Sequence, residues 1–311
     1  MNEYVVGIGA ANVDVYGTSE MKIRLHYDHP SIIKTGVGGV TRNILENISR
    51  LGVRAKLLSA IGDDIYGDLV REKSCEAGID MDHIKLVKGG RTSIFMQVMD
   101  SNNDMHIALC DMSINKNINT AYIKKNASII KNAAAVILDP SLPNDVLEYI
   151  LDNFTEVPIF VDPISDNYAK KIKPYLSKFY CLKPNKTELA TLANMKIETD
   201  EDLIKAYKRV IKKGVKKLYV SLGKGGCLYT NDDGEIVRAQ LKPVENMVNA
   251  SGAGDSFFAT IIYGTVKGFK EESIVNYAMA AGIATIGVKE TINPKLSIAY
   301  LDKVLKKHII K

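Results

Sequence analysis

The stretch Tyr4-Val5-Val6-Gly7-Ile8-Gly9-Ala10-Ala11-Asn12 sets the fold class of this 311-residue chain. Its first five residues are apolar or small nearly throughout, which predicts a strand that is covered on both faces. Similar runs recur along the chain, separated by helical patterns. This repetition predicts an α/β fold with a doubly wound, mainly parallel sheet flanked by helices. The predicted strands are 4–8, 55–61, 134–138, 158–161, 179–182 and 217–222, and the predicted helices are 40–51, 65–77, 120–131, 143–152, 167–176, 186–194 and 200–213.

Two inserts interrupt this rhythm and predict a small β lid. Residues 12–37 form an irregular, mixed segment, and residues 91–113 contain two strand-like runs around the polar stretch 100–104, as in a β-hairpin. A second hairpin is predicted at 226–240. Because no Pro/Gly/Ser-rich linker divides the chain, we expect one domain over residues 1–311 with the lid attached.

The composition is that of an ordinary globular protein, with 46% hydrophobic and 25% charged residues. Apolar runs are too short for a membrane span, and the N-terminal residues do not resemble a signal peptide. Four widely spaced cysteines favour reduced thiols and a cytoplasmic location. The net charge of +5 comes from dispersed lysines, so we expect no nucleic-acid partner and no membrane partner.

The glycines after the first strand nearly match a dinucleotide-binding fingerprint. Asn12 replaces the third glycine, and the next segment does not have a helical pattern, so a dehydrogenase is disfavoured. Asn12 and Asp14 instead stand just beyond the carboxyl end of a strand, where ligands bind in open α/β sheets. A carboxylate there can accept hydrogen bonds from two neighbouring hydroxyls, as a sugar diol requires.

Two further glycine-rich segments remain open between a structural and a functional interpretation. Thr35-Gly36-Val37-Gly38-Gly39-Val40-Thr41-Arg42-Asn43 precedes a predicted helix, and it is either a tight turn or a ligand contact, which Asn43 favours. Ser221-Leu222-Gly223-Lys224-Gly225-Gly226 lacks a complete Walker motif and is either a hairpin loop or a nucleotide neighbour. Lys183-Pro184-Asn185-Lys186-Thr187-Glu188 predicts a helix cap, with Asn185 and Glu188 near a hydrated Mg²⁺ as the functional alternative.

The most specific motif is Asn249-Ala250-Ser251-Gly252-Ala253-Gly254-Asp255, which precedes an apolar helix. A buried helix start leaves backbone N–H groups unpaired unless an anion lies there. Asp255 alone could serve as an N-terminal charge partner of the helix. That role does not explain the two glycines, which are poor helix formers, whereas a phosphate cradle beside a catalytic base explains all three residues.

Three of these motifs, in chain order, resemble the signatures of the ribokinase-like (PfkB) family of sugar and nucleoside kinases: Gly36–Gly52, Lys183–Glu188 and Asn249–Asp255. The resemblance extends over essentially the whole chain. The resemblance implies ATP as phosphoryl donor, Mg²⁺, a small-molecule sugar or nucleoside acceptor and a homodimer formed through the lid. Several other stretches look closest to the branch of the family that phosphorylates pseudouridine. A binding regulator without activity is the alternative from another class, against which the intact Asp255 argues.

The resemblance also implies a role for each candidate residue. Asp255 would be the catalytic base, beside an anion hole formed by Gly252, Ala253 and Gly254. Acceptor contacts would come from Asn12, Asp14, Gly38, Gly39, Asn43, Thr92, Asp111, Met112 and Asp139. Nucleotide contacts would come from Asn185, Ser221, Gly223, Gly226, Asn276 and Met279, and Mg²⁺ would lie near Asp162, Asn185 and Glu188, through water.

One departure from the family pattern concerns a monovalent cation. Asn249 stands where the second signature of the family has Asp, next to a cation loop that corresponds to Val288–Asn293 in this chain. K⁺ is therefore a candidate additional cofactor, with Asn249 as the candidate cation residue.

Overall fold

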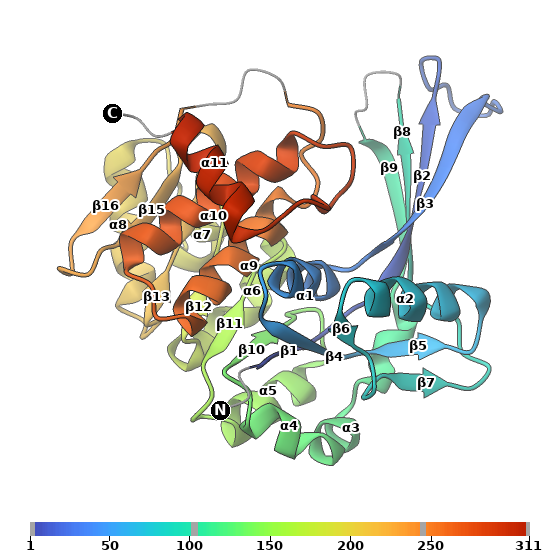
Figure 1. The fold of residues 1–311 in the computed structure, drawn as a ribbon, viewed down its shortest axis with the longest axis horizontal. Coiled ribbons are helices and arrows are strands. Elements are labelled where there is room, and N and C mark those ends of the chain that lie inside the picture. Colours follow the sequence, from blue (N-terminus) through green and yellow to red (C-terminus); the bar gives the residue numbers. More distant parts are fainter. Residues whose placement is uncertain (1–3, 101–104, 243–246, 309–311) are drawn as a thin grey trace.

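The protein is described here from a computed structural model, which describes residues 4–100, 105–242 and 247–308. Its main sheet has seven strands in the order β13-β12-β11-β10-β1-β4-β6, and all neighbouring pairs are parallel (Figure 1). The predicted doubly wound, mainly parallel sheet is confirmed. The strands are β1 (Tyr4–Ile8), β4 (Arg54–Leu58), β6 (Ile79–Asp80), β10 (Ala135–Leu138), β11 (Ile159–Val161), β12 (Cys181–Leu182) and β13 (Lys217–Leu218).

Helices cover both faces of this sheet, as the side chains of β1 illustrate. Val6 and Ile8 belong to one hydrophobic cluster, and Val5 belongs to the cluster on the opposite face. Gly7 shares the Val5 face and lets α1 approach closely, since an added Cβ would lie 2.7 Å from Leu45. The helices are α1 (Val40–Arg50), α2 (Ile65–Glu76), α3 (Thr120–Lys125), α4 (Ala127–Lys131), α5 (Asn144–Asn153), α6 (Asp166–Ile172), α7 (Lys186–Ala193), α8 (Asp200–Ile211), α9 (Ala253–Val266), α10 (Glu271–Ile286) and α11 (Ile298–His308).

Some predicted elements are divided in the structure. The run 55–61 contains β4 and β5 (Ala60–Gly62), because the chain leaves the main sheet after Leu58 to pair with β7 (Lys85–Val87). The run 217–222 is divided for the same reason, since β14 (Val220–Ser221) joins β15 (Cys227–Thr230) and β16 (Ile236–Ala239) in a separate antiparallel sheet. The second predicted hairpin is thereby confirmed. Short 3₁₀ helices complete the chain at η1 (Ser113–Asn117), η2 (Lys173–Lys178) and η3 (Gly223–Gly225).

The lid is a separate four-stranded sheet in the order β3-β2-β8-β9, which extends away from the main sheet (Figure 1). The hairpin of β8 (Ile94–Met99) and β9 (Met105–Asp111) is confirmed, and its predicted turn at 101–104 lies outside the described residues. The prediction of an irregular segment at 12–37 is wrong in its detail. β2 (Asn12–Ser19) and β3 (Ser31–Gly38) are regular antiparallel partners, and residues 31–35 are all exposed, so no burial pattern marks β3 as a strand.

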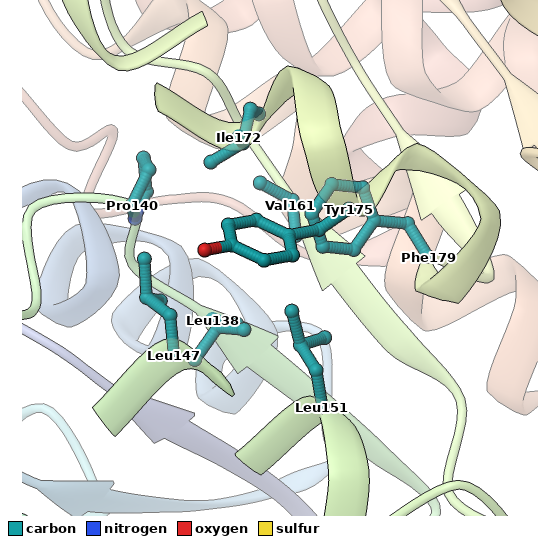
Figure 2. A pocket seen from close by; sticks show the side chains of 8 residues that line it. All are labelled: Leu138, Pro140, Leu147, Leu151, Val161, Ile172, Tyr175 and Phe179. Atoms are coloured by element: carbon teal, nitrogen blue, oxygen red, sulfur yellow. The ribbon is translucent and has the colours of Figure 1, made fainter. Parts of the chain in front are cut away.

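A narrow apolar pocket lies in the core beside α5 and η2 (Figure 2). It is too narrow for a water molecule, and its lining has no charged side chain, so it is a feature of core packing. Eight residues line it: Leu138, Pro140, Leu147, Leu151, Val161, Ile172, Tyr175 and Phe179.

Among the described residues, no helix combines the length and the apolar character needed to cross a membrane.

Candidate active site

Strand register places an ion pair at the carboxyl end of the main sheet. Val161 of β11 pairs with Leu182 of β12, so the next residues of both strands, Asp162 and Lys183, stand side by side. The Lys183 ammonium lies 2.6 Å from Asp162 Oδ2, and both side chains are buried. Two parallel strands thus deliver one buried cation and one buried anion to the edge where ligands bind in such sheets.

Lys183 has no role in the sequence-based prediction, yet the structure places it against the glycine motif. A Cβ atom added at Gly254 would lie 3.3 Å from the Lys183 Nζ atom. Burial alone would lower the pKa of Lys183, but Asp162, followed by Glu188 and Asp255, outweighs this effect and raises it. The ammonium is therefore charged and faces the start of α9. A lysine directly after a buried strand and before Pro-Asn was the signal available in the sequence.

The start of α9, at residues 252–254, is the predicted anion cradle. Gly252 precedes the helix in the left-handed region with φ of 76°, and its backbone packs against Thr291, where an added Cβ would lie 1.8 Å from the carbonyl oxygen. No described side chain caps this end of the helix. The N–H groups of the first turn are consequently open to a ligand, and the neighbouring Gly254 is exposed. The role of Gly252, Ala253 and Gly254 as an anion hole stays a prediction.

Asp255 lies in the first turn of α9 and is half-buried. Burial raises the pKa of Asp255 to about 6, with Asp162 and Asp14 acting in the same direction. Asn43 from α1 and the charge of Lys183 oppose the rise, and Asn43 Nδ2 donates to Asp255 Oδ2 at 3.0 Å. A carboxylate with a pKa just below neutrality suits a general base.

Asp14 stands on β2 at the root of the lid, buried among polar partners. Its carboxylate accepts hydrogen bonds from Asn12 Nδ2 at 2.6 Å and from the Tyr16 hydroxyl at 2.8 Å. Burial raises the pKa of Asp14, while these hydrogen bonds and the charge of Arg42 oppose the rise. Gly38 of β3 makes room for the carboxylate, because an added Cβ would lie 2.2 Å from Asp14 Oδ2.

Gly39 links this strand to α1 and needs the conformation of glycine. Its φ is 101°, and an added Cβ would lie 2.5 Å from the Ala10 carbonyl oxygen. The sequence-based interpretation of residues 35–43 as a pre-helical loop is therefore wrong in part. Gly36 and Gly38 belong to a lid strand, and only Gly39 stands at the helix start.

Asp139 and Thr92, which are predicted to contact the acceptor substrate, have their side-chain oxygens engaged in hydrogen bonds within the protein. Asp139 follows β10 and accepts hydrogen bonds from Ala10 N and Thr41 Oγ1, both at 3.1 Å, and from Ser141 N at 2.8 Å. It thereby ties the β1–β2 connection to α1. Thr92 is likewise occupied, since its hydroxyl donates to Asp64 at 2.6 Å and accepts from Gly62 N at 2.9 Å. Both residues thus hold the backbone around them, and their role as acceptor contacts stays a prediction.

Asp111 and Met112 lie where the lid returns to the main body. Asp111 ends β9 opposite Ile94, is exposed, and accepts a hydrogen bond from Ser113 N at 3.0 Å. Met112 is half-buried and precedes η1. Among the described residues, no hydrogen bond or ion pair joins either residue to Asp14, so their acceptor role stays a prediction.

The helix cap predicted at α7 is confirmed. Asn185 Oδ1 accepts from Glu188 N at 2.9 Å, and Glu188 Oε2 accepts from Asn185 N at 2.8 Å. Burial, followed by the charge of Asp162, raises the pKa of Glu188. Ser221 of β14 forms a parallel bridge with Asn185, which brings the predicted nucleotide loop next to this cap.

The remaining predicted residues lie around the same loop and the motif before α9. Gly223 begins η3 and Gly226 follows it, with positive φ values of 57° and 86°. On α10, Asn276 is half-buried and Met279 is buried in a hydrophobic cluster. Asn249 Nδ2 donates to the Lys289 carbonyl at 3.0 Å, while Asn249 Oδ1 accepts from Ser251 N, so it joins the motif to the loop 287–297 between α10 and α11.

The chain was compared with protein families and known proteins. Residues 2–298 match the model of the pfkB family carbohydrate kinases. A pseudouridine kinase from Escherichia coli (strain K12) is 34% identical over 298 residues, covering 96% of this chain and 95% of that protein. A guanosine-inosine kinase from Exiguobacterium acetylicum is 25% identical over 268 residues, covering 84% and 87%.

A solved structure agrees with the fold. The ribokinase of Arabidopsis thaliana, complexed with ribose and ATP, superposes with a TM-score of 0.86 at 24% identity and covers 98% of this chain and 99% of that chain. Fold and sequence therefore point to one family. The chain belongs to the PfkB family of carbohydrate kinases, which are ATP-dependent phosphotransferases that act on hydroxyl groups of sugars or nucleosides.

Proposed function

We propose that this kinase transfers the γ-phosphoryl group of ATP to the 5′-hydroxyl of pseudouridine. The 34%-identical relative with that name supports the acceptor, over nearly the full length of both chains. So does the resemblance of several stretches to the same branch of the family: His29-Pro30, 36–44, 58–62, 108–114, 161–165 and 293–297. The alternatives are ribose, another nucleoside or a hexose, and the guanosine-inosine kinase relative keeps other nucleosides open.

One observation carries the acceptor site. Asn43 reaches the proposed base Asp255 from the first turn of α1, and Gly38, just before that helix, packs against Asp14. A sugar held by Asp14 and Asn43 would therefore have a hydroxyl next to Asp255. Lone pairs remain on the Asp14 carboxylate after its two internal hydrogen bonds, which leaves capacity for a ribose diol.

The residues of this chain then divide the chemistry. Asp255 accepts the proton of the attacking hydroxyl, since its pKa of about 6 leaves it ionised at neutral pH. The amides of Gly252, Ala253 and Gly254 and the ammonium of Lys183 stabilise negative charge on the transferred group. ATP with Mg²⁺ supplies the phosphoryl group and neutralises part of its charge. Positioning and charge stabilisation provide most of the rate.

The charged groups suit a magnesium ion held through water. No cluster of three or more His, Cys, Asp or Glu side chains that could hold a metal exists in the described parts of the chain. Glu188 and Asn185 are engaged in their cap, and Asp162 is paired with Lys183. We infer that these three residues contact the hydration shell of Mg²⁺, which retains waters readily. Ser221, Gly223, Gly226, Asn276 and Met279 remain the proposed contacts of the nucleotide.

Monovalent cations are a separate question. Asn249 donates to a carbonyl of the loop 287–297, and it lacks the charge of the Asp found in relatives. We infer that Asn249 joins the two loops by hydrogen bonds, and K⁺ dependence stays a prediction. Activity measured in K⁺ and in tetramethylammonium buffers of equal ionic strength would decide it.

We also propose a homodimer through the lid. Strand register puts Ile33, Met96, Val98, Ile107 and Leu109 on one face of the lid sheet, opposite to the face that carries Asp14. Four of these side chains are between 42% and 64% exposed. An uncovered apolar sheet face of this kind fits a second copy of itself. The cytoplasmic location stays a prediction.

The dimer is tested by molar mass in solution. We expect a dimer for the unmodified chain and a monomer for Leu109→Lys, while Ile204→Lys on α8, where Ile204 is 40% exposed, serves as the control. A monomer for the unmodified chain would contradict the proposal.

The acceptor is tested with a panel of pseudouridine, uridine, inosine, ribose and fructose, each with Mg-ATP. We expect the highest kcat/KM for pseudouridine. Equal or higher kcat/KM for ribose or uridine would refute the assignment of pseudouridine and leave the kinase activity intact. If Asp255→Asn retained full turnover, the proposed base itself would be wrong.

A further inference from the structure

Tyr16 lies beside the acceptor carboxylate but belongs to none of the predicted site motifs. It follows Asp14 by two residues on β2, so both side chains are on the same face of the lid sheet. The Tyr16 hydroxyl donates to Asp14 Oδ2 at 2.8 Å. Tyr16 is half-buried, which removes part of this hydrogen bond from competition with water.

The two glycines of β3 beside this pair differ in how closely its side chains approach them. Gly36 is the register partner of Asp14, and an added Cβ there would lie 4.0 Å from Tyr16 Cε2. Gly38 leaves space for the carboxylate itself. The Asp14 carboxylate therefore needs glycine at position 38, whereas the Tyr16 ring would leave room for a Cβ atom at position 36.

Tyr16 also contacts the other half of the active site. The Thr291 side chain interacts with the same hydroxyl and opposes the rise that burial causes in the pKa of Tyr16. Thr291 lies in the loop 287–297, and its carbonyl oxygen packs against Gly252 at the start of α9. The Tyr16 side chain therefore lies between the Asp14 carboxylate on the lid and the loop segment that packs against Gly252 at the start of α9.

We propose that Tyr16 is a positioning residue that orients the Asp14 carboxylate and couples lid placement to the anion cradle through Thr291. The inference rests on the proposed role of Asp14 in binding the acceptor diol. The phenol keeps one carboxylate oxygen oriented while Asn12 orients the other. With both oxygens fixed before the acceptor arrives, less ordering is needed on binding.

The charged and polar groups around Asp14 determine how removal of the Tyr16 hydroxyl would change the pKa of Asp14. The groups that face Asp14 are Tyr16 and Asn12 from β2, Arg42 from α1 and Asp255 from α9. Burial raises the pKa of Asp14, and the Tyr16 hydrogen bond opposes this rise. Removing the Tyr16 hydroxyl raises the pKa of Asp14 further. As pH falls, Asp14 is then protonated earlier, so acceptor binding is lost at a higher pH than in the unmodified protein.

The test uses Tyr16→Phe, which retains the ring, together with Thr291→Val and the double variant. We expect Tyr16→Phe to raise the KM for the nucleoside by about tenfold, as the loss of a hydrogen bond to a charged group predicts. The KM for ATP should change less than twofold. The acid limb of nucleoside binding, measured by calorimetry between pH 5 and 8, should move to higher pH.

The double variant tests the coupling. If Thr291 acts through Tyr16, the double variant resembles Tyr16→Phe, and the two effects on nucleoside KM are not additive. An unchanged pH limb and unchanged nucleoside KM in Tyr16→Phe would overturn the inference, as would fully additive effects. Should Tyr16→Phe fail to fold in thermal melts, Thr291→Val alone decides, because it must then raise the nucleoside KM.

Asp14→Asn separates this inference from the proposed function. If Asp14→Asn leaves nucleoside binding unchanged, the proposed acceptor site is wrong. If Asp14→Asn weakens binding and Tyr16→Phe does not, the acceptor site stands and the role of Tyr16 is refuted.

Discussion

The hydrogen bond between Asn43 and Asp255 makes a quantitative prediction for Asn43→Leu. The bond is 3.0 Å long and lowers the pKa of Asp255, which is about 6 with the bond present. A hydrogen bond to a charged group is worth about 1.5–3 kcal/mol, and one pKa unit corresponds to about 1.4 kcal/mol. Removing it should raise the pKa of Asp255 by roughly one to two units, to about 7–8.

The sign follows from the role of Asp255 as a base. Only the ionised carboxylate accepts a proton, so activity is lost as pH falls through the pKa, and a higher pKa moves this loss to higher pH. At pH 6 the unmodified enzyme should have about half of its plateau kcat/KM, and Asn43→Leu about a tenth or less of its own plateau. At pH 9 both proteins should be on their plateaus.

The assay is kcat/KM for the nucleoside between pH 5 and 9 with saturating Mg-ATP. Asn43 is also a proposed acceptor contact, but a lost contact lowers the plateau, whereas a shifted pKa moves the midpoint. Protonation of ATP is common to all variants and cancels in the comparison of midpoints. Asn47→Leu is the matched control, since Asn47 is buried one turn further on α1 and donates to the Asn43 carbonyl at 2.8 Å.

We expect the midpoint of Asn47→Leu to stay with that of the unmodified protein. A midpoint for Asn43→Leu within about 0.3 units of the unmodified value would refute the assignment of this limb to Asp255. An equal shift in both variants would instead indicate a general loosening of α1.

Three further predictions concern the same site. Asp255→Asn should lower kcat by about 10²–10⁴-fold while calorimetry still detects nucleoside binding; loss of binding instead would indicate a structural role. Gly38→Ala should raise the nucleoside KM by about ten- to a hundredfold, because the added Cβ displaces the Asp14 carboxylate. Gly36→Ala, whose Cβ would have its nearest neighbour 4.0 Å away, should be tolerated. Equal KM values for the two variants would contradict this geometry. Lys183→Met should lower kcat by about 10²–10³-fold, while Lys217→Met, which breaks the ion pair with Glu271, should affect the melting temperature and leave kcat within about twofold; similar kcat losses would mean that Lys183 acts through stability.

The main sheet was predictable from the sequence because its strands are covered on both faces. Residues 4–8 match β1 at both ends, and residues 134–138 match β10 within one position. The motif around Gly252 was predictable for a different reason, since two glycines ahead of an apolar helix have few uses other than close backbone approach. Local sequence sufficed where the local environment determined the residue types.

The lid and the ion pair depended on contacts distant in the sequence. β3 is exposed along residues 31–35 and is a strand because β2 pairs with it, which no burial pattern reveals. The partner of Lys183 is set by the register of β11 with β12, twenty residues apart in the chain, and cannot be inferred from periodicity. Asp139 connects Ala10 and Thr41 through its carboxylate, which no sequence pattern reveals, and its predicted role as an acceptor contact stays untested.

The lid as a separate sheet has a consequence for how such a kinase can diversify. The proposed acceptor carboxylate of Asp14 and the neighbouring Gly38 come from β2 and β3, while Asp162, Lys183 and the proposed anion cradle come from the ends of main-sheet strands and from the start of α9. Substitutions in the lid can therefore change which hydroxyl compound is accepted while the phosphoryl-transfer groups stay fixed. Evolution of a new acceptor, or its laboratory selection from lid libraries, can proceed in this chain without rebuilding the catalytic machinery.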